Sequence, residues 1–330
     1  MPIKEFTQAN TPNEVLQSSI GAENIIALRQ AFFERVLYHT KSPMELIPEL
    51  ERVFPACNTL PEALAQLDDL KKCLDSFRPL NPTQAERLQA AWDTEYTYES
   101  NKIEGNTLTL SETHVVINEG MTVAGKTVRE HLEAINHKEA VGYLHDIVKN
   151  DIDLSEWVIK NMHELILKQD ERNHDQRGKY RLENVEITGT TFVPPQSFLV
   201  PELMSELMKH YEEKKAVLHP VELAADIHSE LVGVHPFIDG NGRTSRLVMN
   251  LILLRAGFPI ANISGDRNKR LDYYNALNDS HIEHKDEPFR MLVAQYVRDG
   301  LFRYLAMVSG NANTDTEKGR YFYERMATGQ

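Results

Sequence analysis

The chain has 330 residues and a formal net charge of −13, and 41% of its residues are hydrophobic. This length and apolar content allow one large or two modest domains with real cores, which excludes a wholly disordered protein. An acidic chain without a basic cluster repels a phosphate backbone, so a nucleic-acid partner is not expected. The polar N-terminus and the lack of a long apolar run predict a cytoplasmic protein with no membrane span.

The spacing of apolar residues is helical along most of the chain, which predicts an all-α fold. We expect a helical N-terminal region over residues 1–80, a central domain over 81–310 and a C-terminal tail or helix over 311–330. The expected helices cover residues 14–39, 43–54, 59–76, 83–105, 110–119, 128–149, 154–168, 198–214, 220–234, 243–256, 268–282 and 287–307.

The helix expected over 83–105 has recognisable signals at both ends. Thr83 and Glu86 form the T-x-x-E pattern of a capping box, which predicts the helix start. Gly105 follows its last turn, where a residue in the left-handed conformation commonly ends a helix. Ser100 and Glu104 lie four residues apart, so they share one face of this helix.

One stretch favours β-structure instead. It begins with β-formers, continues through a glycine-containing turn, and returns through further β-formers before two prolines end it. We therefore expect a small β-hairpin in the otherwise helical fold. Its residues are Val185, Ile187, Thr188, Gly189, Thr190, Thr191, Phe192 and Val193, followed by Pro194 and Pro195.

Residues 235–246, which read HPFIDGNGRTSR, lie between two apolar helical segments. Pro236 ends the first of these helices, and the second is apolar on nearly all sides, as a central helix would be. Phe237 is placed to anchor the connection in the core. The sequence therefore predicts a loop clamped between two core helices.

This loop has the groups needed to bind phosphate. Gly240, Asn241 and Gly242 can turn successive backbone N–H groups inward, and the N-terminus of the following helix adds positive potential. Arg243 and Arg246 lie about one turn apart on that helix, and each guanidinium can donate two hydrogen bonds to phosphate oxygens. The pattern indicates a site for a nucleotide phosphate.

Two more side chains supply chemistry at the same loop. Asp239 is a hard oxygen ligand of the kind that a phosphate-bridging Mg²⁺ needs. A neutral imidazole at His235 is suited to remove a hydroxyl proton near pH 7. Together these groups describe attack of a hydroxyl on a nucleotide phosphate.

The segment HPFIDGNGRTSR resembles the Fic signature H-P-F-x-(D/E)-G-N-G-R-x-x-R, and every specified position is filled. The resemblance implies a helical Fic core and an adenylyltransferase, a nucleotidyltransferase that moves AMP from ATP onto a Ser, Thr or Tyr hydroxyl of a target protein or of itself. It implies that His235 is the base and that Asp239 holds Mg²⁺. It further implies that Asn241, Gly242 and Arg243 hold the α- and β-phosphates, and that Arg246 reaches the γ-phosphate.

Residues 100–105, SNKIEG, resemble the inhibitory motif (S/T)-x-x-x-E-(G/N) of Fic proteins with an N-terminal inhibitory helix. The residues themselves agree with this, because a carboxylate at the C-terminus of a helix is disfavoured by the dipole and is better placed beside an arginine. If Glu104 pairs with Arg246, the γ-phosphate loses its partner. The resemblance therefore implies an autoinhibited enzyme with Ser100, Glu104 and Gly105 in the inhibitory motif.

The expected hairpin, together with residues 177–181, resembles the flap by which Fic proteins dock a target segment, and Tyr274 lies where the family places nucleotide-side contacts. Family analogy suggests a homodimer. Three alternatives stay open: removal of AMP with the help of Glu104, transfer of another phosphate-containing group such as UMP, and a nucleotide-responsive interaction module with little turnover. The target, the activating signal and the role of residues 1–80 are not encoded in any recognisable pattern.

Overall fold

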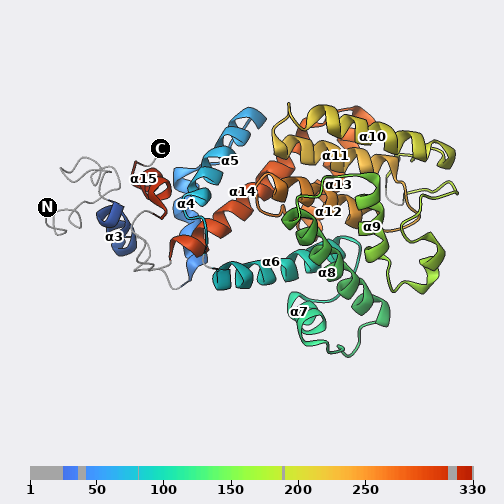
Figure 1. Ribbon diagram of the computed structural model, residues 1–330, viewed down its shortest axis with the longest axis horizontal. Coiled ribbons are helices and arrows are strands. Elements are labelled where there is room, and N and C mark those ends of the chain that lie inside the picture. Colours follow the sequence, from blue (N-terminus) through green and yellow to red (C-terminus); the bar gives the residue numbers. More distant parts are fainter. Residues whose placement is uncertain (1–24, 36–41, 81, 188–189, 311–317, 329–330) are drawn as a thin grey trace. The chain divides into compact units, whose positions relative to one another are not determined.

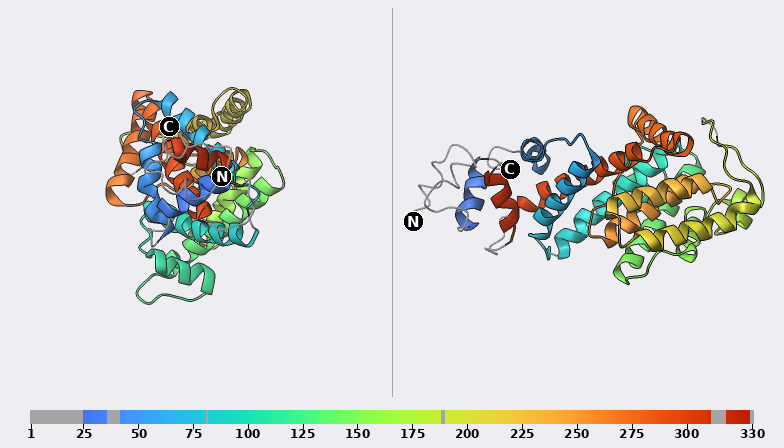
Figure 2. Two further views of the ribbon diagram at one scale, coloured as in Figure 1. Left: turned by 90° about the vertical axis from the view of Figure 1, so that its left-hand side faces the viewer. Right: turned by 90° about the horizontal axis from the view of Figure 1, so that it is seen from above.

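The computed structural model describes residues 25–35, 42–80, 82–187, 190–310 and 318–328. Every regular element within these ranges is helical, so the all-α fold is confirmed (Figures 1 and 2). The chain forms two compact units. The terminal unit comprises Met1–Pro82 and Val297–Gln330, and the central unit comprises Thr83–Tyr296.

The terminal unit joins residues from both ends of the chain. Here α15 packs against α3, α4 and α5, and the rings of Phe32 and Phe322 lie 5.5 Å apart, edge to face. The part of the expected helix 14–39 outside residues 25–35 lies outside the described residues. The elements of this unit are α3 (Ile25–Arg35), η2 (Pro43–Leu46), α4 (Ile47–Val53), α5 (Leu60–Asp75) and α15 (Arg320–Thr328).

Helix α14 (Glu287–Ser309) is divided between the units, because its residues from Val297 onward group with the terminal unit. Arg298 donates to the carbonyl of Phe54 at 2.7 Å, and the Phe302 ring lies 6.4 Å from the Phe54 ring. From the sequence we expect the central domain to end at residue 310, whereas the central unit ends at Tyr296. The residues after Tyr296 are assigned by contacts such as Arg298 with Phe54, which are 244 positions apart in sequence and leave no local signal.

In the central unit, two helices begin at side-chain caps that are visible in the sequence. Thr109 with Glu112, and Thr127 with Glu130, form complete capping boxes that start α7 and α8 at the predicted residues. The elements are α6 (Pro82–Ile103), α7 (Leu110–Glu119), α8 (Val128–Lys149), α9 (Glu156–Ile166), η3 (Glu171–Gln176), η4 (Ser197–Leu199), α10 (Val200–Lys214), α11 (Pro220–Val234), α12 (Asn241–Arg255) and α13 (Arg267–Glu283).

Helix α12 is the central helix of this unit. Nearly all of its residues from Asn241 to Leu253 are buried, and it packs against α8, α9 and α11 (Figure 1). This confirms the helix that the sequence predicts to be apolar on nearly all sides. The phosphate-binding pattern therefore begins at the N-terminus of a helix that cannot easily shift, because its neighbours surround it.

The start of α6 differs from the prediction, and its end agrees with it. The helix begins at Pro82, so Thr83 lies inside the first turn and is not the N-cap of a T-x-x-E box. Proline suits this turn because its fixed φ is helical and its missing N–H would have no partner there. Gly105 has φ +93°, which confirms the left-handed residue after the helix.

The predicted β-hairpin is wrong for the described residues, since residues 182–187 and 190–196 contain no strand. Thr188 and Gly189 lie outside the described residues. The ends of this segment are held by other bonds: Ser197 donates through its backbone N–H to Asn184 Oδ1 and through its hydroxyl to the Leu182 carbonyl. Pro194 and Pro195 have no N–H to donate to a strand ladder.

Across the part of the chain that the structure describes, no helix combines the length and the apolar character needed to cross a membrane.

Candidate active site

The loop between α11 and α12 begins with an unusual backbone conformation. His235 ends α11 in the left-handed region, with φ 49° and ψ 57°, and its N–H donates to the Leu231 carbonyl at 3.1 Å. Few non-glycine residues adopt positive φ, and those that do are commonly held there by their surroundings. The left-handed turn at His235 ends α11 and redirects the chain into the loop.

The His235 imidazole has the protonation state of a base. Its Nδ1 lies 3.3 Å from the Val232 carbonyl, which can only accept, so Nδ1 carries the hydrogen and Nε2 keeps a lone pair. Burial lowers the pKa of His235. The nearby charge of Arg181 lowers this pKa further, while Glu104 and Asp239 act in the opposite direction. The ring is therefore neutral near pH 7.

Asn241 closes the loop. Its amide oxygen accepts from the backbone N–H of Phe237 at 2.9 Å, and its amide nitrogen donates to the carbonyl of Phe237 at 2.8 Å. Phe237 is fully buried, as predicted. The Asn241 side chain thus holds the loop in shape. Because Asn241 is the first residue of α12, its backbone N–H belongs to the N-terminus of that helix.

His163 on α9 supports the same loop, although sequence analysis did not single it out. Its ring stacks on Phe237 with centroids 3.7 Å apart and an interplanar angle of 6°. Nδ1 accepts from the Gly178 N–H at 3.0 Å, so Nε2 carries the hydrogen and donates to the Asp239 carbonyl at 2.9 Å. Burial lowers the pKa of His163 to about 4, so the ring is neutral at pH 7. A histidine on an apolar helix face gives no sequence signal of such a role.

Asp239 keeps a carboxylate at the surface of the loop. Its Oδ1 accepts from the Gly240 N–H at 2.6 Å and lies 3.3 Å from Arg243 Nη2, and its side chain is 37% exposed. Within the described residues, no three His, Cys, Asp or Glu side chains gather into a metal cage. One carboxylate fits Mg²⁺, which is usually held by one or two carboxylates together with substrate phosphates.

Arg246 and the end of α6 make the predicted contact. The Arg246 side chain is 1% exposed, and its Nη2 lies 2.7 Å from Glu104 Oε1. Nε donates to the Ser100 hydroxyl at 3.0 Å, and Nη2 donates to the Ser100 carbonyl at 2.9 Å. A buried guanidinium needs such partners because an unpaired charge in the interior is costly.

The Glu104 carboxylate also lies against the first turn of α12. A Cβ atom on Gly242 would be 2.6 Å from Glu104 Oε1 and 3.1 Å from Arg246 Nη1, so an alanine here would have to displace the carboxylate. Backbone N–H groups at a helix N-terminus attract anions. Glu104 therefore places a negative charge where the sequence pattern predicts a phosphate.

Residues of α13 and of the loop before it hold the end of α6. Lys102 Nζ lies 2.5 Å from Asp266 Oδ1, and Glu99 accepts from the Gly265 N–H at 2.6 Å. The Tyr274 hydroxyl donates to the Ile103 carbonyl at 3.2 Å. Tyr274 thus lies beside the Glu104 end of α6, and a contact with nucleotide stays a prediction.

The flap residues lie beside α13. Thr190 donates through its hydroxyl to Asn278 Oδ1 at 2.7 Å, and the Phe192 ring lies 4.7 Å from the ring of His281. Ile187 and Phe192 are half-buried, while Thr191 and Val193 are exposed. Target docking by this segment stays a prediction.

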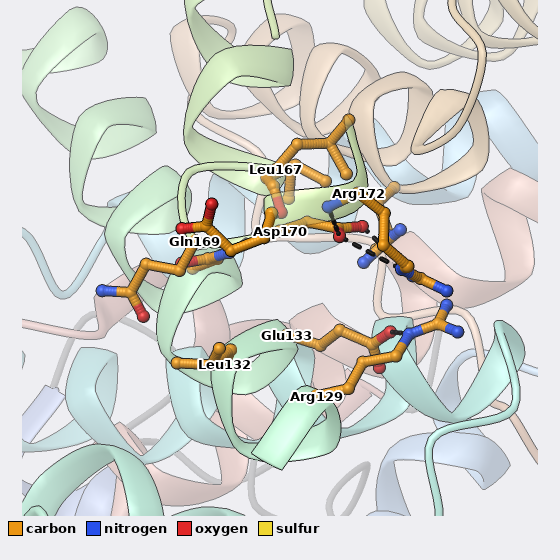
Figure 3. Close-up of a pocket in the computed structure, with 11 residues that line it drawn as sticks. Arg129, Leu132, Glu133, Leu167, Gln169, Asp170 and Arg172 are labelled. Atoms are coloured by element: carbon orange, nitrogen blue, oxygen red, sulfur yellow. Dashed lines mark hydrogen bonds and ion pairs between the residues drawn. The ribbon is translucent and has the colours of Figure 1, made fainter. Parts of the chain in front are cut away.

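Arg243 borders a cavity of about 390 Å³ between α8 and the segment after α9 (Figure 3). Across this cavity, Arg129 pairs with Glu133 at 2.7 Å and Arg172 pairs with Asp170 at 3.2 Å. These two guanidinium groups already have carboxylate partners. Arg243 Nε is buried and has no hydrogen-bond partner among the described residues.

Comparisons with known proteins show which family this chain resembles. A model of the Fic/DOC family matches residues 153–253, which include α9 and most of α12. The "Protein adenylyltransferase Fic" of Nematostella vectensis is 33% identical over 318 residues, covering 92% of this chain and 71% of that protein. The chain belongs to the Fic family.

A second relative, the protein of the same name from Drosophila yakuba, is 32% identical over 289 residues, which are 86% of this Fic chain and 56% of that protein. The Fic chain thus spans little more than half of some curated relatives. Among solved structures, C. elegans Fic-1 is 27% identical with a TM-score of 0.66, covering 90% of this chain and 88% of that one. A Fic-domain signaling protein from Bacteroides thetaiotaomicron is 28% identical with a TM-score of 0.64, covering 75% and 96%.

Proposed function

We propose that this Fic chain is a protein adenylyltransferase that moves AMP from ATP onto a hydroxyl of a protein. The observation that carries the proposal is the junction of α11 and α12. His235 ends α11, Asp239 lies in the connecting loop, and the buried Arg246 belongs to α12. The names of the curated relatives support the same activity.

The proposed reaction uses His235 as the base. Its Nε2 takes the proton of the attacking hydroxyl as the hydroxyl oxygen forms a bond to the α-phosphorus of ATP. The bond between the α-phosphorus and the oxygen bridging to the β-phosphorus breaks, and pyrophosphate leaves. The product carries AMP through a phosphodiester bond. A hydrogen on Nδ1 and a neutral ring are the state that this step requires.

The start of α12 binds the phosphates in this proposal. The backbone N–H groups of Asn241 and Gly242 face the α- and β-phosphates, whereas the Gly240 N–H is bonded to Asp239 Oδ1. Arg243 adds a charge whose Nε has no other partner among the described residues. Arg246 binds the γ-phosphate. Asp239 would hold Mg²⁺, which neutralises charge on the phosphates when it is bound.

We further propose that Glu104 inhibits the enzyme by pairing with Arg246, the residue that would otherwise bind the γ-phosphate. Its carboxylate is 2.7 Å from Arg246 Nη2, and its place against Gly242 puts a negative charge next to the phosphate site. ATP then binds without its γ-phosphate partner, and its α-phosphate is not presented to His235.

A second candidate, removal of AMP from a modified protein, is favoured by the partial exposure of Glu104. The Glu104 side chain is 36% exposed although its Oε1 is engaged with Arg246, so a carboxylate oxygen can reach water at the site. This oxygen would orient a water for attack on the AMP–protein bond. AMP release from a premodified target that depends on Glu104 distinguishes this reaction from transfer.

The partners in this proposal are ATP and a protein with a Ser, Thr or Tyr hydroxyl, docked along the flap residues 187–193. A homodimer and a cytoplasmic location stay predictions from the sequence.

The test uses the wild type, Glu104→Gly and the double variant Glu104→Gly/His235→Ala. Each is incubated with Mg²⁺ and ATP, and intact masses are measured, because self-modification substitutes for an unknown target. We expect mass gains in steps of one adenylyl group in Glu104→Gly alone. Equal gain in the double variant would contradict the role of His235. No gain in any protein that still binds ATP would contradict transfer to self, and AMP removal or nucleotide-gated binding would become the working function.

A further inference from the structure

Arg181 is as little exposed to solvent as Arg246, but its surroundings are different. It is 1% exposed and is among the largest fully buried side chains of the described residues. Arg246 has the carboxylate of Glu104, whereas the hydrogen bonds of the Arg181 side chain all go to backbone carbonyl oxygens in the described part of the chain. Burial lowers the pKa of Arg181, although an arginine remains charged.

The three carbonyls that Arg181 binds come from separate places. Nε donates to the His235 carbonyl at 2.8 Å. Nη1 donates to the Glu183 carbonyl at 2.9 Å, and Nη2 donates to the Pro195 carbonyl. Glu183 and Pro195 are close to the two ends of the connection that carries the flap residues. The backbone N–H of Arg181 adds a fourth bond, to the Pro236 carbonyl at 2.9 Å.

We propose that Arg181 is a positioning residue for His235, holding the His235 backbone turn to both ends of the flap connection through one guanidinium. The proposal rests on the proposed role of His235 as the base. The bonds to His235 and Pro236 secure the two carbonyls around the left-handed turn. That turn sets the direction in which the imidazole leaves the backbone, so its loss displaces Nε2 from the attacking hydroxyl.

The planar guanidinium is suited to this task and a lysine is not. Arginine has five N–H donors in a fixed arrangement, so three carbonyls can be held at defined angles at once. A lysine at the same place keeps the positive charge but has no rigid arrangement of donors. The two substitutions Arg181→Lys and Arg181→Met therefore separate geometry from charge.

Charge gives a second readout. Burial lowers the pKa of His235 most, and the bond to the Val232 carbonyl raises it. Of the nearby charged groups, Arg181 lowers this pKa, and Glu104 and Asp239 raise it. Removal of the Arg181 charge therefore raises the pKa of His235. Because a base must be neutral, the acid side of the rate profile moves to higher pH in Arg181→Met and stays in place in Arg181→Lys.

The experiment measures kcat, the KM for ATP and the pH profile of self-adenylylation in the Glu104→Gly protein, alone and with each Arg181 substitution. Arg290→Lys is the matched control, because Arg290 is a partly buried arginine of the central unit whose bonds go to Asp226 at 2.7 Å. We expect Arg181→Lys to lower kcat by about 10- to 100-fold with KM changed less than about twofold. The control should keep kcat and the pH profile.

Unchanged kcat in Arg181→Lys would overturn the proposal, as would an equal loss in Arg290→Lys. If Arg181→Met does not fold, the kcat of Arg181→Lys alone tests the proposal. A separate NMR titration of the His235 ring, assigned with His235→Ala, needs no turnover. If the Glu104→Gly protein transfers nothing, the proposed function fails, but the NMR spectra still test the positioning. Changed His235 ring chemical shifts in Arg181→Lys, which keeps the charge, would support it, and unchanged shifts would overturn it.

Discussion

Glu104 Oε1 lies 2.7 Å from Arg246 Nη2, and the same oxygen would be 2.6 Å from a Cβ atom on Gly242. One carboxylate therefore satisfies the buried guanidinium and also fills the space beside the N-terminus of α12. These two effects, charge and volume, compete with a phosphate in different ways. Substitutions at and around this contact can separate them.

Glu104→Gln removes the charge and keeps most of the volume. The Arg246 guanidinium keeps its charge, so the variant can still accept its hydrogen bond but loses the Coulomb attraction of the ion pair. For a partly exposed carboxylate this attraction contributes about 1–2 kcal/mol. We expect ATP to bind about tenfold more tightly than to the wild type, and less tightly than to Glu104→Gly. Calorimetry in the His235→Ala background measures binding without turnover.

The matched control is Glu139→Gln, which neutralises a carboxylate paired with Lys168 at 2.6 Å. This control should bind ATP as the parent does. Wild-type affinity in Glu104→Gln would mean that the volume of the side chain, and not its charge, excludes ATP.

The pair Lys102–Asp266 holds the end of α6 near Glu104, with Nζ and Oδ1 2.5 Å apart. Asp266 is 66% exposed, so the pair is screened by solvent and contributes at most about 1 kcal/mol. We expect Lys102→Ala to raise the initial rate of self-adenylylation by about two- to fivefold. Lys168→Ala breaks an exposed pair elsewhere and should leave the rate unchanged. A slower Lys102→Ala enzyme would show that the pair does not restrain α6.

Much of the fold was predictable because its signals are local. The bounds of α7 and α8 follow from capping boxes that involve residues three positions apart, and α11 follows from Pro220 at its first position. The helix dipole predicts that Glu104 needs a cation, and the resemblance to the Fic inhibitory motif implies that this cation is Arg246.

The missed features depend on contacts that have no local pattern. His163 donates to a carbonyl 76 residues away, and Arg181 to one 54 residues away. Their partners are backbone atoms, which every residue has, so no complementary side chain marks them in the sequence. The segment after Arg181 looks like a hairpin by composition. Its Glu183 and Pro195 carbonyls, however, accept from Arg181, so those oxygens are not free for a strand ladder.

Gly242→Ala tests whether the Glu104 carboxylate needs the space beside α12. The added methyl group would overlap Glu104 Oε1, and overpacking of this kind costs about 1–3 kcal/mol. In the Glu104→Gly background the overlap is removed, so the alanine should cost less. We expect the two substitutions to show a coupling free energy of about 1 kcal/mol or more.

Urea unfolding followed by tryptophan fluorescence measures this coupling. Trp92 and Trp157 are the two tryptophans of the chain, and both belong to the central unit. Additive effects of Gly242→Ala and Glu104→Gly would contradict the close approach.

The stability of the central unit should decrease in mild acid because His163 is buried in its neutral form. Burial lowers the pKa of His163 to about 4, whereas an unfolded histidine has a pKa of about 6.5. Between these values the unfolded chain binds more protons than the folded one, so stability is lost as the pH falls from about 6.5 to about 4. At pH 5 the loss due to this one group is about 2 kcal/mol relative to pH 7.

His163→Gln removes this titration and keeps an amide that can donate to the Asp239 carbonyl and accept from the Gly178 N–H. The free energy of unfolding, measured by urea at pH 7 and pH 5 without divalent cations, should therefore change less with pH in His163→Gln than in the wild type. Comparing the two proteins cancels the acid sensitivity of other buried histidines such as His137 and His228, whose pKa values are also lowered by burial. Equal pH dependence in both proteins would mean that His163 does not bind the loop in its neutral form.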